Sequence, residues 1–349
     1  MLLVQDQRAM SIELPILRLG LAGFSLQQEE RLGAALERSG SALWHLGKFA
    51  DADAWCVNGA RVQVLPDGTV RIAPGVPGGR SLHLDLHDVD RPIAFSLPLG
   101  TRQLEPLFTF DAESQRGVAV VLEKFEGWLR PQMAQFCLAS RILEQETVLG
   151  TGVHHVSING RLIAVVDMRG EIGVLPTAGP LDFDDAIWHR RPAGAVIPEH
   201  FVRIGLSQLM WQFAQRTARD VLPQRYREET MYFRRPPRLP QRLLSDSHLL
   251  LLRELACAPA DFADLQQRTG LGSVAMARDL SALYFVGAIT TNPKRAAPVA
   301  ARRATDASQL PSQPPSVPSG LGTEPPAQPP KKRTPYISDM TAPAPMGPR

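Results

Sequence analysis

The chain has 349 residues, of which 44% are hydrophobic and 21% charged, and its formal net charge is +3. This composition is ordinary for a soluble globular protein, and the length predicts two or three compact units. The three cysteines are widely separated and form no CxxC pair, which argues against a disulfide framework and a zinc knuckle. No apolar run approaches the roughly 20 residues that span a bilayer. We therefore expect a soluble, cytoplasmic protein without a membrane partner.

The first part of the chain, residues 1–146, predicts an α/β domain. Its apolar run at residues 15–24 is typical of a strand buried on both faces of a parallel sheet. Ser25 and Gln28 then form a capping-box pattern at the start of a helix. Two strand-like runs follow, "ALWHLGKFA" and "DADAWCVNGA". A strand, a helix and further strands in this order indicate a parallel α/β sheet.

This alternation changes after residue 60. The segment "RVQVLPDGTVRIA" alternates around Asp67 and Gly68, and it predicts a hairpin where a helix is expected. Strand-like runs follow at residues 81–89 and 91–99. Residues 111–146 then predict a long helix that is bent or broken at Pro131.

Several positions in residues 12–145 resemble the receiver domains of bacterial response regulators. Asp53 leads the third strand, and Asn58 occupies the phosphoacceptor position five residues later. Ser96 matches the switch hydroxyl, and Glu105-Pro106 matches the Lys-Pro pair with the charge reversed. The resemblance implies an irregular receiver-like or flavodoxin-like α/β fold. The alternative is another α/β or α+β arrangement.

The chemistry of a receiver is missing from this sequence. The first strand ends in "LGLAGF", without the acidic pair that holds magnesium, and the phosphoacceptor position is degenerate because Asn58 carries an amide. Phosphoryl transfer needs the metal to neutralise the charge that develops on the phosphate. We therefore expect no phosphorylation of this domain.

Residues 147–192 predict a small antiparallel β meander. Asn159-Gly160 is a strong two-residue turn signal, and Arg169-Gly170 is a weaker one. Residues 193–243 predict an amphipathic helix, whose apolar face includes Val202, Leu206 and Met210, followed by an Arg-rich connector.

The Arg-rich connector is a candidate ligand-binding segment. Guanidinium groups bind phosphates bidentately, and aromatic residues such as Tyr226 and Phe233 can stack on bases. A nucleotide or an acidic partner is therefore the expected ligand, and a solvated linker is the alternative. The spacing of Arg234 and Arg238 also resembles half of the PilZ-type motif, which implies a cyclic dinucleotide as a possible ligand. The candidate residues are Arg225, Arg227, Arg234, Arg235, Arg238 and Arg242.

Residues 244–293 predict three short helices and a trailing strand, which resemble a winged-helix module. The strand after Gly287 has no visible returning partner, so we expect a truncated wing. Three arginines against five carboxylates give residues 245–292 a net charge of −2, which favours protein contact over DNA. The candidate partner-binding residues are Met276, Arg278, Leu283 and Tyr284.

Residues 294–349 predict a disordered tail, because thirteen prolines lie between Pro298 and Pro348. The chain has no GxSxG motif, P-loop or HExxH, and its histidines and aspartates at residues 154–189 lack known metal-ligand spacing. We therefore expect no catalytic residues, metal or cofactor. The resulting hypothesis is a non-catalytic bacterial signalling or regulatory adaptor that binds protein or nucleotide. The alternative is a DNA-binding transcriptional regulator.

Overall fold

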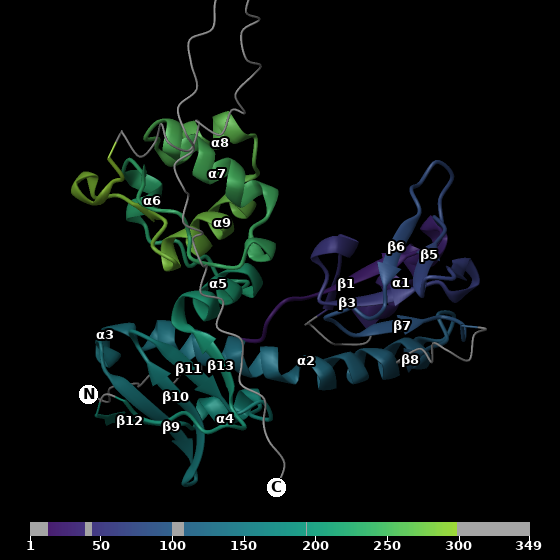
Figure 1. The fold of residues 1–349 in the computed structure, drawn as a ribbon, viewed down its shortest axis with the longest axis horizontal. Coiled ribbons are helices and arrows are strands. Elements are labelled where there is room, and N and C mark those ends of the chain that lie inside the picture. Colours follow the sequence, from purple (N-terminus) through teal and green to yellow (C-terminus); the bar gives the residue numbers. More distant parts are fainter. Residues whose placement is uncertain (1–12, 39–43, 100–107, 193, 299–349) are drawn as a thin grey trace, which may run out of the picture. The chain divides into compact units, whose positions relative to one another are not determined.

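The computed structural model describes residues 13–38, 44–99, 108–192 and 194–298, and the part that it describes has mixed α/β architecture (Figure 1). It contains a parallel sheet, an antiparallel meander and a helical C-terminal region. Glu105-Pro106 and the Pro-rich tail from residue 299 onward lie outside the described residues.

Five short strands form the parallel sheet that the first part of the sequence predicts. The sheet order is β2-β1-β3-β7-β8, and every neighbouring pair is parallel. Numbered along the chain, these strands follow the order 2-1-3-4-5, one of the two common orders of doubly wound α/β sheets. The strands are β1 (Leu17–Ala22), β2 (Trp44–Gly47), β3 (Ala54–Val57), β7 (Ile93–Phe95) and β8 (Phe108–Thr109).

Local signals around this sheet are confirmed. Helix α1 (Leu26–Arg38) begins with the expected capping box, in which Ser25 N donates to Gln28 Oε1 at 3.0 Å and Gln28 N donates to Ser25 Oγ at 3.4 Å. Asp67-Gly68 forms the turn between β4 and β5, and Gly68 has a φ of 84°. The hairpin belongs to a three-stranded antiparallel sheet of β4 (Val62–Val64), β5 (Thr69–Ile72) and β6 (Leu82–Asp85).

The long helix α2 (Gln115–Glu144) continues through Pro131 without a break. Its first half buries Val118 and Phe125 in the core of the parallel sheet. Its second half buries Phe136 and Cys137 in a different core, which belongs to the antiparallel sheet. One helix therefore contributes to two hydrophobic cores.

The predicted meander is the centre of a five-stranded sheet with the order β12-β9-β10-β11-β13. Asn159 and Gly160 form the turn between its first two strands, and both have a positive φ. The short helix α3 (Glu146–Leu149) precedes the strands of this sheet, and the short helix α4 (Pro180–Asp184) lies between its third and fourth strands in the sequence. The strands are β9 (Val153–Ile158), β10 (Arg161–Asp167), β11 (Glu171–Val174), β12 (Ile187–Arg191) and β13 (Val202–Gly205).

The prediction of a helix that includes Val202 is wrong. Val202–Gly205 forms strand β13, which pairs with β11, and helix α5 begins only at Leu206 and ends at Arg216. Val202 and Ile204 are β-branched and alternate with Arg203 and Gly205, a pattern that suits a strand as well as a helix. Pairing with β11 selects the strand.

The three helices expected in the C-terminal region are confirmed as α7 (Asp246–Cys257), α8 (Phe262–Thr269) and α9 (Ser273–Phe285). The expectation that the trailing strand lacks a partner is wrong. Strand β15 (Ile289–Thr290) pairs with β14 (Tyr232–Phe233). The partner strand lies in the Arg-rich connector, before the three helices, and not after Gly287, where a returning strand would follow. The connector also contains the short helix α6 (Arg225–Glu228).

Candidate functional site

Asn58 lies immediately after β3, at the carboxyl edge of the parallel sheet, and is 7% exposed. Its Nδ2 donates to the Gly23 carbonyl at 3.0 Å, and its Oδ1 accepts from Ala60 N at 3.2 Å. The Ser96 hydroxyl also donates to this Oδ1 at 3.3 Å, and it accepts from Gly59 N at 3.1 Å. The amide therefore joins the ends of β1, β3 and β7.

This arrangement uses both the donor and the acceptor of the Asn58 side chain. A carboxylate at the same place would lose the donor and face the Gly23 carbonyl oxygen directly, which is unfavourable in a buried setting. The loop after β1 contains Gly23, Phe24 and Ser25, so it offers no carboxylate for a metal. The polar groups at this edge of the sheet form hydrogen bonds with one another.

Asp53, which precedes β3, lies at the other end of this strand. Its carboxylate forms an ion pair with Arg216 of α5 and accepts a hydrogen bond from Arg18 N at 2.9 Å. Arg18 in turn donates from Nη2 to the Gln215 carbonyl at 3.1 Å. Asp53 is 9% exposed, so its role in the structure is to join the parallel sheet to α5.

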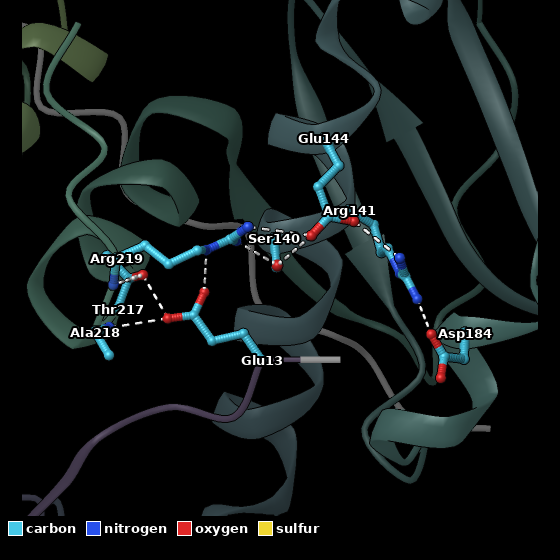
Figure 2. A network of polar contacts seen from close by, with 8 residues as sticks. All are labelled: Glu13, Ser140, Arg141, Glu144, Asp184, Thr217, Ala218 and Arg219. Carbon is cyan, nitrogen blue, oxygen red and sulfur yellow. Dashed lines mark hydrogen bonds and ion pairs between the residues drawn. The ribbon is translucent and has the colours of Figure 1, made fainter. Parts of the chain in front are cut away.

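A second polar network joins the segment before β1 to α2 and α4 (Figure 2). The Glu13 carboxylate accepts from Thr217 Oγ1 at 2.6 Å and from Ala218 N at 2.8 Å, and it pairs with Arg219 Nε at 2.6 Å. Arg219 also contacts Glu144 at 3.2 Å. Glu144 also forms an ion pair with Arg141 at 2.8 Å, and Arg141 forms a second ion pair with Asp184 of α4. Each carboxylate of this network is therefore paired with an arginine of the fold.

The six candidate arginines of the connector have different environments. Arg227 forms an ion pair with Asp220, and its guanidinium lies over the Phe262 ring. Arg225 lies over the rings of Tyr226 and Tyr284. Arg235, Arg238 and Arg242 are exposed, and Arg234 is partly exposed. The structure brings only Arg234 and Arg235 together with other candidate residues in a cavity.

The cavity has a volume of about 340 Å³ and lies where the end of α2, the start of α5 and the end of α9 meet. Its apolar lining includes Ile142, Leu143, Met168, Leu206, Met210 and Phe285. Its polar lining consists of Glu146, Ser207, Arg234, Arg235 and Tyr284. Glu146, Ser207 and the apolar residues were not identified from the sequence as parts of one site, because they come from four distant segments that carry no shared motif.

The two cavity arginines lie against Gly287. Arg235 donates from Nε to the Gly287 carbonyl and from Nη2 to the Val286 carbonyl, both at 3.3 Å. A Cβ at position 287 would lie 3.1 Å from Arg234 Nη1 and 3.2 Å from Arg235 Nη2, and Gly287 has a φ of 64°. The positive φ favours glycine at this position, whereas the flexible guanidinium groups could make room for a Cβ by small shifts. Neither guanidinium forms an ion pair with any residue that the structure describes.

The four candidate partner-binding residues on α9 divide between core and surface. Met276 and Leu283 are 0% exposed and belong to the core of the C-terminal helices, so they present no contact surface. Their spacing on α9 reflects packing against neighbouring helices. Arg278 and Tyr284 are partly exposed, and Tyr284 lines the cavity. Burial raises the pKa of the Tyr284 hydroxyl, and the nearby Glu146 carboxylate raises it further.

The histidines at residues 154–189 lie on strands of the antiparallel sheet, and Asp182 lies on α4. His155 lies opposite His189 on neighbouring strands. Asp182 accepts from Gly179 N at 2.8 Å at the start of α4. No group of three or more His, Cys, Asp or Glu side chains within the described ranges is placed to hold a metal ion. Burial raises the pKa of the Cys56 thiol and raises that of Cys137 to about 12, as expected for core cysteines.

Comparison with known proteins finds no matching family model, no matching curated protein and no matching solved structure. Among the helices that the structure describes, none is both long enough and apolar enough to cross a membrane.

Proposed function

We propose that this chain is a non-catalytic signalling or regulatory adaptor, in which signal enters by binding of a ligand or partner and leaves through a protein contact. The observation that carries this proposal is the environment of Asn58. At the position that resembles a phosphoacceptor, the chain has an amide whose donor and acceptor both hold the sheet edge together. Such a residue is a scaffold component.

The strand order supports the receiver-like part of the proposal. A parallel sheet with the chain order 2-1-3-4-5 is the flavodoxin-like arrangement that receiver domains share. This chain departs from it between β3 and β7, where the three-stranded sheet of β4, β5 and β6 occupies the place of a helix. A receiver-like scaffold that has lost its acidic site fits both observations.

The cavity supports binding as the route of input. Concave, mainly apolar cavities with a few convergent polar groups are the usual form of small-molecule sites, and volumes begin at about 300 Å³. Arg234 and Arg235 give this cavity two cationic groups without carboxylate partners in the described part of the chain. Guanidinium groups that lack a carboxylate partner favour an anionic ligand.

Incubation with acetyl phosphate and magnesium tests the proposal. We expect neither the wild-type protein nor Asn58→Asp to gain a phosphoryl group, because the loop after β1 supplies no carboxylate to hold the metal. Intact-mass spectrometry measures the adduct, circular dichroism checks that the variant is folded, and a receiver domain that accepts phosphate serves as the positive control. A phosphoryl adduct on either form would refute the proposal.

A DNA-binding transcriptional regulator is the second candidate, and the β14–β15 pair favours it because it supplies a two-stranded wing. Helix α9, the counterpart of a recognition helix, argues against it, since seven of its thirteen residues are buried. A mobility-shift titration on random duplex separates the candidates. Steep salt dependence that disappears when Arg234, Arg235 and Arg238 are replaced by Ala supports DNA binding, and the absence of any shift excludes it.

A further inference from the structure

We propose that the cavity binds a nucleoside phosphate, with the phosphate on Arg234 and Arg235 and the base against Tyr284 and Phe285. The inference rests on the proposed function, because it names the class of ligand through which signal enters. Three features of the cavity carry it: two guanidinium groups that form no ion pair with a described residue, two neighbouring aromatic rings, and a carboxylate on the same lining.

The anion-binding half consists of the two arginines beside Gly287. Arg235 donates to two neutral backbone carbonyls at 3.3 Å, which is long for a charge-assisted hydrogen bond. Arg216 and Arg219 are bound to carboxylates, whereas Arg18 and Arg61 donate to backbone carbonyls, as Arg235 does. Because a phosphate accepts bidentate hydrogen bonds from guanidinium at shorter distances, it is a better partner than the carbonyls.

The base-binding half consists of the rings of Tyr284 and Phe285, whose centroids lie 5.2 Å apart at an interplanar angle of 44°. Aromatic side chains bind nucleic acid bases by stacking, whatever the base. Met168 and Met210 also line the cavity, and unbranched methionine side chains adapt to a ligand of irregular shape. An inorganic anion would leave this apolar surface uncovered.

Glu146 and Ser207 supply polar groups that a nucleoside can use. The Glu146 carboxylate is an acceptor for sugar hydroxyls or for an exocyclic amino group, and Ser207 can donate or accept. A ligand with a phosphate alone would bring its charge near Glu146 without a compensating donor. The combination therefore favours a ligand that carries an anion at one end and hydrogen-bond donors at the other.

Isothermal titration of the full chain tests the inference. The probes are AMP, GMP, CMP, UMP, cyclic di-GMP and cyclic di-AMP, with adenosine and inorganic phosphate as half-ligands, each up to ~1 mM. We expect at least one phosphate-bearing nucleotide to bind at one site per chain and more tightly than either half-ligand. Comparing the mononucleotides with the cyclic dinucleotides shows which of these two kinds of nucleoside phosphate the cavity binds more tightly.

Variants locate the site. We expect Arg234→Ala with Arg235→Ala to weaken binding by about 100-fold, and Tyr284→Leu by about 10-fold. The matched control is Arg238→Ala with Arg242→Ala, which removes the same charge from exposed positions outside the cavity and should leave binding unchanged. Arg235→Lys keeps the charge without the planar fork and should give an intermediate loss. Melting temperatures verify that each variant is folded.

Three outcomes would overturn the inference. They are the absence of saturable binding by every nucleotide probe, an equal loss in the control pair, and inorganic phosphate binding as tightly as the best nucleotide. None of these outcomes depends on whether acetyl phosphate labels the chain, so the inference and the proposed function can fail separately.

Discussion

Asn58 illustrates how the identity of one side chain excludes one chemistry and supports another role. An aspartate would have the same length and would keep the acceptor for Ala60 N and Ser96 Oγ, but it would lack the Nδ2 donor that reaches the Gly23 carbonyl. Restoring the carboxylate therefore disturbs the sheet edge without supplying a metal site. An asparagine at position 58 is explained by the hydrogen bonds with which its amide links the ends of β1, β3 and β7.

His248 is a second residue whose surroundings determine its protonation. It is 2% exposed, its ring lies 4.4 Å from the Trp211 ring, and its Nδ1 accepts from Ser245 N at 3.1 Å. Its Nε2 lies 3.3 Å from Asp279 Oδ1. Burial lowers the pKa of His248, and the Asp279 carboxylate opposes this effect without reversing it. The folded protein therefore favours the neutral imidazole.

This lowered pKa predicts acid sensitivity. The unfolded chain takes up a proton near the ordinary value of 6.5, before the folded chain does, so the stabilisation is complete above that pH and is lost as the pH falls toward the folded value. Between about pH 7.5 and about pH 5.5, we expect His248→Phe to lose less free energy of unfolding than wild type, by on the order of 1 kcal/mol. Urea titrations at both pH values measure this difference.

His154 and His155 also have lowered pKa values, because of burial and the nearby charges of Arg190 and Arg191, and they remain in both proteins. They contribute the same background to the wild type and to the variant. An identical pH dependence in the two proteins would show that His248 is not the responsible group.

At the scale of elements, two helices connect the parts of the described chain. Helix α2 contributes to the cores of both large sheets. Helix α5 contributes Phe213 to the core of the antiparallel sheet and Trp211 to that of the C-terminal helices. At the end of α5, Arg216 reaches Asp53 beside the parallel sheet. Side chains of α2 and α5 therefore connect the separate cores.

The Asp53–Arg216 pair is the clearest of these contacts to test. The Asp53 side chain is 7% exposed, so removing Arg216 alone leaves a buried carboxylate that keeps the Arg18 N–H and the nearby Arg18 charge but loses its ion-pair partner. A double-mutant cycle with Asp53→Asn and Arg216→Met should give a coupling free energy of about 1–3 kcal/mol in urea unfolding.

The exposed Arg31–Glu113 pair provides the matched control for this cycle. Its side chains are 55% and 61% exposed, and exposed ion pairs contribute little to stability. Its coupling should be about 0.5 kcal/mol or less. Equal coupling in the two cycles would contradict a specific role for Asp53.

Among the helices and strands, local features could be predicted from the sequence, and long-range strand pairing could not. Capping at Ser25 and the turn at Asn159-Gly160 were predictable because their hydrogen bonds and backbone angles are local. Strand β13 was not, since Val202 and Ile204 fit a helix or a strand until β11 selects one. The pairing of β14 with β15 was also not predictable, because the two strands are separated by three helices.

At the scale of the whole molecule, the candidate site is a product of long-range packing. Two of its arginines could be identified from the charge of the connector, and Tyr284 from its place on α9. Their common cavity with Glu146 of α3 and Ser207 of α5 could not be identified, because no local pattern relates these segments. Binding should therefore require the folded full chain.

Native mass spectrometry of the full chain, after incubation with acetyl phosphate, magnesium and the nucleotide panel, tests the central claim most directly. We expect a non-covalent adduct of one nucleotide per chain, absent when Arg234 and Arg235 are both replaced by Ala, and no covalent phosphoryl adduct. Either a covalent phosphoryl adduct or the absence of any nucleotide adduct would contradict this expectation.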